Sequence, residues 1–225
     1  MRVRYEGPRS IVVFGTGGFA EVVKYILESE SDLRVVAFAE TADRIQRTEF
    51  AGVPVVPFEE VGMRCPPETH GMFIAVGYAG LNAVRRSYFE AAKAKGYRLL
   101  TYVCSRATCW DNVIIGENSF VFEDNTVQPF VRIGDNVVVW SGNHIGHHSV
   151  IEDHCFITSH VVVSGHCTVG ASSFVGVNAT ISEGTRIGQR NLIGPSSLIQ
   201  KDTADDEAYL APRTPRFAKP SSRFF

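Results

Sequence analysis

Residues 133–151 read IGDNVVVWSGNHIGHHSVI, and this stretch decides the fold of the C-terminal half of the chain. A β-branched aliphatic residue opens each group of six. The same register continues without exception through fifteen positions, all Ile or Val: Ile115, Val121, Val127, Ile133, Val139, Ile145, Ile151, Ile157, Val163, Val169, Val175, Ile181, Ile187, Ile193 and Ile199. A period of six differs from the period of two of a half-buried strand and predicts short repeated units.

Other positions of the six-residue unit are also restricted. A small or modest side chain stands four residues after each aliphatic, and glycine often follows it directly, as in Ile115-Gly116. We expect three units to close one triangular turn of a left-handed parallel β-helix, with both inward positions in its core and glycine allowing positive φ at some corners. Residues 18 apart then stack, so Asn125 and Asn143 are expected to form an amide ladder inside the coil.

The N-terminal half follows a different pattern. Ile11–Phe14 predicts a short buried strand, which runs into a glycine turn over 15–18 and then a helix from Phe19 to Leu27. Further strands are expected over 35–38 and 72–76, with a helix over 81–95. Strands that alternate with helices predict a small parallel sheet.

The change of pattern divides the chain. We expect an α/β, Rossmann-like nucleotide-binding domain over residues 1–108 and a β-helix with a C-terminal extension over residues 109–225.

Composition restricts the class of partner. The chain has 22 Lys and Arg against 24 Asp and Glu, so its net charge of −2 would not draw it to nucleic acid or an anionic membrane. It shows no signal-peptide core and no apolar stretch of membrane-spanning length, and we expect a cytoplasmic protein. Five cysteines without a C-x-x-C pair argue against disulfides and structural zinc, and for reduced, mostly buried thiols.

The glycine turn is a candidate phosphate site. Gly15, Gly17 and Gly18 at a strand-to-helix turn allow a diphosphate to approach the backbone and rest on the helix N-terminus. Glu40 lies about 20 residues further on, where an acid can accept a hydrogen bond from a ribose hydroxyl. An NAD-dependent dehydrogenase would share this turn, but the N-terminal half leaves no room for a second nucleotide-binding half and a substrate domain. A tight turn without a ligand is the other reading.

Histidines gather in the middle of the β-helix segment. Six of the seven fall within residues 144–166. His148, His154, His160 and His166 share one position of the repeat, so His148 and His166 should lie one above the other. We expect most of His154, His160 and His166 to be solvated or to pack at a subunit contact. His147 stands one position earlier, near a corner, and is the stronger candidate for chemistry.

These motifs resemble those of the bacterial sugar N-acetyltransferases of the left-handed β-helix type that act on nucleotide-linked 4-amino-sugars, exemplified by the bacillosamine-pathway and perosamine enzymes. The resemblance covers nearly the whole chain and rests on 15–19, 75–77 and, most specifically, 141–151. It implies transfer of acetyl from acetyl-CoA to the amine of a nucleotide-linked, 4-amino-4,6-dideoxy sugar for surface polysaccharide such as O-antigen. It also implies a homotrimer with active sites between neighbouring subunits, and no metal.

The resemblance assigns the base to His147, which would take the proton of the attacking amine. Backbone N–H groups at a coil corner would stabilise the oxyanion, and coenzyme A would leave as thiolate without a covalent enzyme intermediate. Relatives place an acid directly after the base; His148 stands there in this chain, and Glu152 or Asp153 is the candidate substitute. Cys155 and Cys167 are expected to be core residues rather than nucleophiles.

Ligand contacts also follow from the resemblance. The nucleotide-sugar contacts map onto Gly17, Gly18, Phe19, Glu40, Thr41, Gly77 and Asn82. The coenzyme contacts map onto Phe156, Gly165 and Val177, although Phe156 replaces a histidine that touches the coenzyme in some relatives. Residues 211–215 look like the extension that closes the coil end and covers the coenzyme.

Three other functions remain open at this point. The same fold and base serve hydroxyl acceptors, as in an O-acetyltransferase for a sugar such as sialic acid. The histidine cluster would also suit a trimeric zinc hydratase of the gamma carbonic anhydrase kind. In a non-catalytic reading, the β-helix is an assembly scaffold and the N-terminal half a nucleotide sensor. The nucleotide base and the sugar are undetermined by the sequence.

Overall fold

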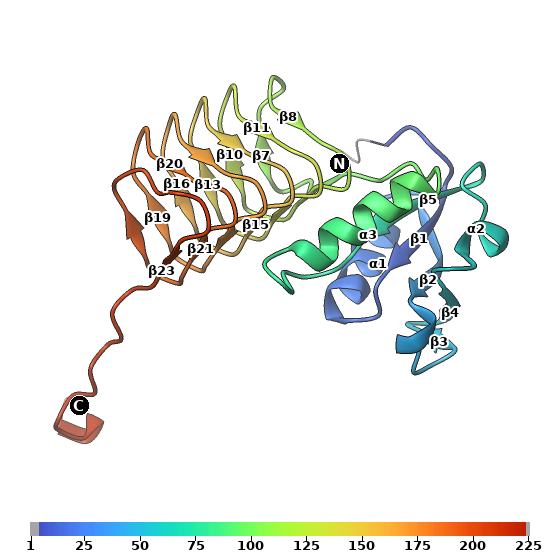
Figure 1. The fold of residues 1–225 in the computed structure, drawn as a ribbon, viewed down its shortest axis with the longest axis horizontal. Helices are drawn as coiled ribbons and strands as arrows, with labels where there is room; N and C mark the ends of the chain where they lie inside the picture. The colour runs from blue at the N-terminus through green and yellow to red at the C-terminus, as the bar shows by residue number, and fades with distance from the viewer. Residues whose placement is uncertain (1–4, 224–225) are drawn as a thin grey trace.

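The computed structural model describes residues 5–223, which form an α/β domain packed on the side of a long β-helix (Figure 1). In the domain, a five-stranded sheet has the order β3-β4-β2-β1-β5 and is parallel except for β3. Its elements are β1 (Ser10–Phe14), α1 (Gly18–Glu30), β2 (Arg34–Glu40), η1 (Ala42–Arg44), β3 (Glu49–Phe50), β4 (Val53–Pro57), α2 (Val61–Arg64), β5 (His70–Ile74) and α3 (Ala83–Ala94).

Residues 11–14 of β1 are all apolar and buried, and both faces of the sheet are covered here. Ile11 and Val13 pack with α1, whereas Val12 and Phe14 pack with α3 and α2. A parallel sheet with helices on both faces requires such continuous apolar strands. The predicted parallel sheet is therefore confirmed.

The predicted left-handed β-helix is confirmed, and its strands are two residues long (Figure 1). Each strand up to β22 pairs in parallel with a strand 18 residues away, and β23 pairs with β21 at a separation of 16 residues. The first sheet contains β6 (Tyr102–Val103), β9 (Phe120–Val121), β12 (Val138–Val139), β15 (Phe156–Ile157), β18 (Phe174–Val175), β21 (Leu192–Ile193) and β23 (Ala208–Tyr209). The second contains β7 (Thr108–Cys109), β10 (Thr126–Val127), β13 (His144–Ile145), β16 (Val162–Val163), β19 (Thr180–Ile181) and β22 (Leu198–Ile199). The third contains β8 (Ile114–Ile115), β11 (Arg132–Ile133), β14 (Val150–Ile151), β17 (Thr168–Val169) and β20 (Arg186–Ile187).

The coil begins earlier than the repeat of aliphatics suggests. Val103 and Cys109 occupy the inward position of the two preceding units and belong to the β-helix core. The first coil strand thus lies within the expected N-terminal domain of residues 1–108. Cys109 concealed this unit in the sequence, because it is not a β-branched aliphatic.

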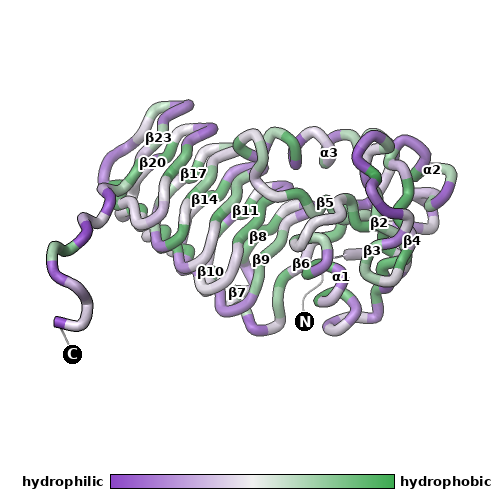
Figure 2. Tube along the Cα trace, turned by 90° about the horizontal axis from the view of Figure 1, so that it is seen from below, coloured by the Kyte–Doolittle hydropathy of each residue, from purple (hydrophilic) through white to green (hydrophobic). Residues whose placement is uncertain are grey.

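Three rows of corners connect the sheets, and we number them by the sheets they join. Corner 1 joins the first sheet to the second (for example 140–142), corner 2 joins the second to the third (146–148), and corner 3 joins the third to the first (152–154). Figure 2 shows hydrophobic strands separated by more hydrophilic corners.

Positive φ falls on the third residue after each inward aliphatic from Ile115 to Ile193. It occurs at Gly142 and Gly184 but also at the four histidines of that position. The glycines that directly follow the aliphatic have a different role. A Cβ on Gly170 would lie 2.5 Å from the carbonyl carbon of Gly188, so glycine there permits the close approach of neighbouring coils.

The predicted stack of Asn125 and Asn143 is present, but its amides bond to the main chain rather than to each other. Oδ1 of Asn125 accepts from the Asn143 backbone N–H at 3.0 Å, and Oδ1 of Asn143 accepts from Val161 N–H at 2.7 Å. The buried amides thus satisfy the backbone of the next coil.

The α/β domain packs on the first sheet and corner 3. Phe19 of α1 contacts the rings of Phe120 and Trp140 with centroid separations of 5.2 and 5.4 Å, and both rings belong to the β-helix. One apolar cluster joins α1, β1 and the first sheet.

The C-terminal segment leaves the coil after its last strand. Strand β23 closes the last coil, and residues 211–217 then run away from it as an exposed segment (Figure 1). The prediction that residues 211–215 close the coil is wrong for the single chain.

All five cysteines are buried free thiols, as expected. In residues 5–223, no helix has the length and apolar character needed to cross a bilayer.

Candidate active site

His147 is exposed on corner 2, directly after strand β13. Its backbone N–H donates to Oε1 of Gln128 in the preceding coil at 2.9 Å. Its ring lies over Gly165 of the following coil, where a Cβ would be 2.9 Å from Cε1. Gly165 thus provides the surface on which the imidazole rests.

Two further histidines surround His147. Its Nδ1 lies 3.2 Å from Nδ1 of His148, and its ring meets that of His166 edge to face at 5.0 Å. His148 stacks on His166 at 4.9 Å, which confirms the predicted vertical pair, and on Phe130 at 4.7 Å. His166 therefore lies beside the candidate base in addition to being exposed.

The Nδ1 to Nδ1 contact allows two proton arrangements, because either ring can be the donor. One of two neutral rings must donate and the other accept. If His147 donates from Nδ1, its Nε2 carries a free lone pair, as a general base requires. His148 then accepts at Nδ1 and carries its own proton on Nε2.

The three imidazoles also form a possible metal site. The ligand atoms of His147, His148 and His166 all lie within 4.8 Å of one another, a grouping found among the described residues. Neutral imidazole is a good ligand for Zn²⁺. The cluster therefore keeps the zinc hydratase as a function to be tested.

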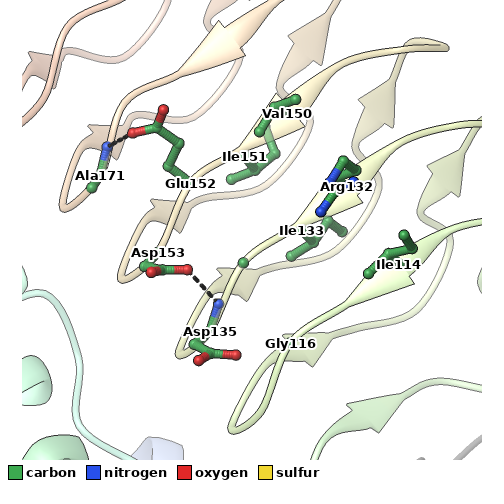
Figure 3. A pocket seen from close by; sticks show the side chains of 11 residues that line it. Ile114, Gly116, Arg132, Ile133, Asp135, Val150, Ile151, Glu152, Asp153 and Ala171 are labelled. Carbon is green, nitrogen blue, oxygen red and sulfur yellow. Dashed lines mark hydrogen bonds between the residues drawn. The ribbon is translucent and has the colours of Figure 1, made fainter.

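The prediction that Glu152 or Asp153 assists His147 is wrong. Both lie on corner 3, across the coil from corner 2, at a groove of about 410 Å³ along the third sheet (Figure 3). Glu152 accepts from Ala171 N–H at 3.0 Å, and Asp153 accepts from Asp135 N–H at 2.8 Å. Each carboxylate caps the backbone of an adjacent coil.

The nucleotide residues expected from the sequence gather at the carboxyl edge of the small sheet. Gly17 caps α1, and a Cβ on Gly17 or Gly18 would meet nothing within 4 Å, so the helix N-terminus faces open space. Glu40 ends β2 and accepts from Thr41 N–H at 3.0 Å. Gly77 follows β5 at the same edge. Ligands of open α/β sheets bind at this edge.

A cleft beside the glycine turn adds two cations that sequence reasoning missed. It has a volume of about 250 Å³ and is lined by Thr16, Gly17, Arg44, Ile45, Gln46, Arg47 and Val55. Arg44 and Arg47 supply positive charge next to the α1 N-terminus, which suits a diphosphate. No motif marks these arginines, because only the fold brings η1 and the loop after it to the turn.

Two expected substrate residues serve the domain contact instead. Phe19 packs on the β-helix aromatics described above. Asn82 is fully buried, and its Nδ2 donates to the carbonyls of Ser172 and Ser173 at 3.0 and 3.2 Å. Its Oδ1 accepts from Arg85 at 2.8 Å. The side chain of Asn82 has no polar atom left for a substrate, so its predicted contact is corrected to a structural one.

One chain does not bring the expected coenzyme residues together. Phe156 is buried on the first sheet between Phe174 and Tyr78. Val177 is exposed on corner 1, whereas Gly165 lies on corner 2. The three residues therefore share no single corner or sheet of the chain.

Comparisons with known proteins agree with both halves of the fold. The model of the PglD N-terminal domain matches residues 10–92, and that of the bacterial transferase hexapeptide (six repeats) matches 112–147 and 130–165. The acetyltransferase domain of PglB from Neisseria gonorrhoeae FA1090, solved with acetyl coenzyme A, is 26% identical with a TM-score of 0.80. The match covers 90% of this chain and 96% of that one. The repeats and the fold of this chain are those of hexapeptide-repeat acetyltransferases.

Two more distant structures share the fold of this acetyltransferase. PerB from Caulobacter crescentus, solved with CoA and GDP-perosamine, is 24% identical with a TM-score of 0.79, covering 92% of this chain and 95% of that one. WeeI from Acinetobacter baumannii AYE is 20% identical with a TM-score of 0.78, covering 88% and 94%. A search of curated protein sequences gave no match.

Proposed function

We propose that this acetyltransferase transfers acetyl from acetyl-CoA to the amino group of a nucleotide-linked amino-sugar, of the 4-amino-4,6-dideoxy class, for surface polysaccharide synthesis. The observation that carries the proposal is the exposed His147–His148 pair on a coil corner. The open glycine turn with its arginine-lined cleft supports a nucleotide diphosphate ligand. The ligands named for the PglB domain and PerB are of the same two kinds.

In the proposed mechanism, Nε2 of His147 accepts the proton of the sugar amine as its nitrogen attacks the thioester carbonyl. The C–S bond then breaks, and coenzyme A leaves as thiolate after the tetrahedral intermediate has collapsed. No cysteine acts as nucleophile. Cys155 and Cys167 lie inside the coil, and burial raises the pKa of Cys155 to about 12, so a thiolate is disfavoured there.

We further propose that the active enzyme is a homotrimer with sites between neighbouring chains. In one chain, His147 lies on corner 2, whereas the α/β domain packs on the first sheet and corner 3. The outward residues of the second sheet, beside corner 2, include the exposed Val162 and Leu198, which suits packing against other copies. Residues 1–108 would bind the nucleotide-sugar and residues 109–225 the coenzyme, in the cytoplasm.

Release of free coenzyme A thiol from acetyl-CoA tests the reaction. Purified enzyme is assayed with UDP-, dTDP- and GDP-linked amino-sugars, and turnover with at least one of them is expected. His147→Ala should lower kcat/KM by about 10²-fold or more, since a positioned general base contributes that much. His70→Ala is the control, because His70 starts β5 at the opposite edge of the sheet.

The other outcomes would change the assigned base, the acceptor group or the function. Full activity of His147→Ala would remove His147 as the base. Turnover only with hydroxyl acceptors would indicate O-acetylation. Stoichiometric zinc in the purified protein, with hydration of carbon dioxide, would indicate the zinc hydratase.

A further inference from the structure

Arg85 is the largest fully buried side chain of the described residues, and its surroundings hold no counterion. It lies on α3 at 0% exposure, and no carboxylate of residues 5–223 forms an ion pair with it. Burial lowers the pKa of its guanidinium to about 9. A buried charge without a partner needs compensation from hydrogen bonds, so its acceptors reveal what the residue does.

All five N–H donors of Arg85 are used. Nη1 donates to the Gly77 carbonyl at 3.0 Å and to Asn82 Oδ1 at 2.8 Å. Nε donates to the carbonyl of Asn136 at 3.3 Å, and Nη2 to those of His154 and Cys155 at 2.7 and 3.1 Å. Only the planar guanidinium offers five donors in this fork, so lysine cannot reproduce the set.

These acceptors belong to both halves of the molecule. Asn136 and His154 lie on corner 3 in consecutive coils, 18 residues apart, and Asn82 extends the row to Ser172 in the next coil. Gly77, by contrast, follows β5 at the proposed nucleotide edge. Arg85 thus connects that edge directly to two stacked coils, and through Asn82 to a third.

The segment that Arg85 holds has an unusual backbone conformation. Gly80, Leu81 and Asn82 have φ of 60°, 50° and 68°, so two non-glycine residues lie in the left-handed region in succession. Side chains rarely adopt this conformation unless the surroundings impose it. Backbone bonds within the turn, such as that from Asn82 N–H to the Tyr78 carbonyl at 3.1 Å, shape this segment, and the Arg85 and Asn82 side chains hold it against the β-helix.

We propose that Arg85 is a positioning residue, which fastens the 77–82 turn to corner 3 and thereby sets the place of the nucleotide-sugar relative to the β-helix. The role of this turn in nucleotide-sugar binding rests on the proposed function. The fastening itself does not, and it can be measured separately.

The experiment compares Arg85→Lys with Arg86→Lys. Arg86 is the next residue of α3, exposed and paired with Glu90, so its variant controls for loss of an arginine from this helix. Arg85→Lys should raise KM for the nucleotide-sugar by about ten-fold or more and leave KM for acetyl-CoA within about two-fold. Backbone amide exchange over 77–82 should become faster, while exchange in the hexapeptide strands stays unchanged.

Two measurements test the role of Arg85 even if no acetyl transfer is detected. They are backbone amide exchange and binding of the free nucleoside diphosphate. The proposal would be overturned if exchange over 77–82 and the KM values are both unchanged. Where no acetyl transfer is detected, unchanged exchange together with unchanged nucleotide affinity would overturn it. If Arg85→Lys does not fold, Asn82→Gly is used, because glycine keeps the left-handed φ and removes only the amide bonds. It should show the same KM split and faster exchange, and a wild-type result would also overturn the proposal.

Discussion

His148 follows the proposed base, at the position where the resemblance implies an acid. An imidazole carries no negative charge, so His148 cannot form an ion pair with a protonated His147. It is instead fixed by stacking between Phe130 and His166. The neighbour therefore orients the base through a hydrogen bond and contributes little charge stabilisation.

Replacing His148 by Asp or Asn separates orientation from charge. The two side chains have the same shape, and both tolerate the φ of 59° at this position. A carboxylate stabilises the protonated imidazole, so the acid limb of kcat/KM for His148→Asp should lie about one pH unit above that for His148→Asn. Profiles from pH 5 to 9 measure this. Coincident limbs would show that residue 148 does not contact the base during the reaction.

At the scale of the element, corner 3 forms a buried polar column. Asn118 donates from Nδ2 to Oδ1 of Asn136 at 2.8 Å, and Asn136 Nδ2 lies 3.0 Å from Nδ1 of His154. Oδ1 of Asn118 accepts from the N–H of Ile74, at the end of β5. The column joins the sheet to the coils, and His154 belongs to it. The prediction that His154 is solvated or lies at a subunit contact is wrong.

This column makes stability depend on pH. Burial lowers the pKa of His154; nearby Arg86 and Arg85 act in the same direction, while Asp153 and Glu90 oppose it. The unfolded chain, with an ordinary pKa near 6.5, then binds more protons than the native one as pH falls below about 6.5. Stability from this site is therefore complete above that pH and is lost as the pH falls towards the lowered native value.

His154→Asn should reduce the loss of melting temperature between pH 7.5 and 5. Asn continues the column, accepts the left-handed φ and does not titrate. Because part of the ring still reaches solvent, the difference from wild type is expected to be at most about 1 kcal/mol, or a few degrees. Thermal unfolding at both pH values measures it, with His160→Asn on exposed corner 1 as the matched control. Parallel losses in all three proteins would exclude His154 as the titrating group.

The two elements differ in how far the sequence predicts them. Inward positions such as Val139 and Ile145 were readable because burial acts on every unit with the same period. The positions of Arg85, Arg44 and Glu152 were not, since their partners lie tens of residues away and depend on which corner meets which element. Nothing in the sequence around Arg85 distinguishes it from an exposed arginine of a helix. The resemblance places the proposed base at His147. That His166 lies beside this residue follows only from the ring contact in the structure.

At the scale of the molecule, the proposed base and the proposed nucleotide edge of one chain lie apart. Corner 2 is the row of corners away from the α/β domain, which covers the first sheet and corner 3. Three copies that pack through their second sheets would bring corner 2 of one chain towards the domain of the next. Such an arrangement would also let residues on different parts of the coil, such as Phe156 and Gly165, contribute to sites shared between chains.

Mixed trimers test this arrangement. One chain carries His147→Ala, and the other carries Gly17→Asp, which puts a carboxylate where the diphosphate would bind. Position 17 faces open space and caps α1, a place that favours Asp, so the fold should be retained. With a different affinity tag on each chain, two-step purification isolates trimers that contain both.

If each site combines His147 of one chain with the glycine turn of the next, every mixed trimer has one intact site of three. It should therefore show about one third of wild-type activity, while both homotrimers are nearly inactive. Sites contained within single chains would leave the mixed trimers as inactive as the homotrimers, since each chain carries one defect. Activity restored only after the two chains have been exchanged into one trimer would locate the reaction at the boundary between subunits, where neither half of the chain can act alone.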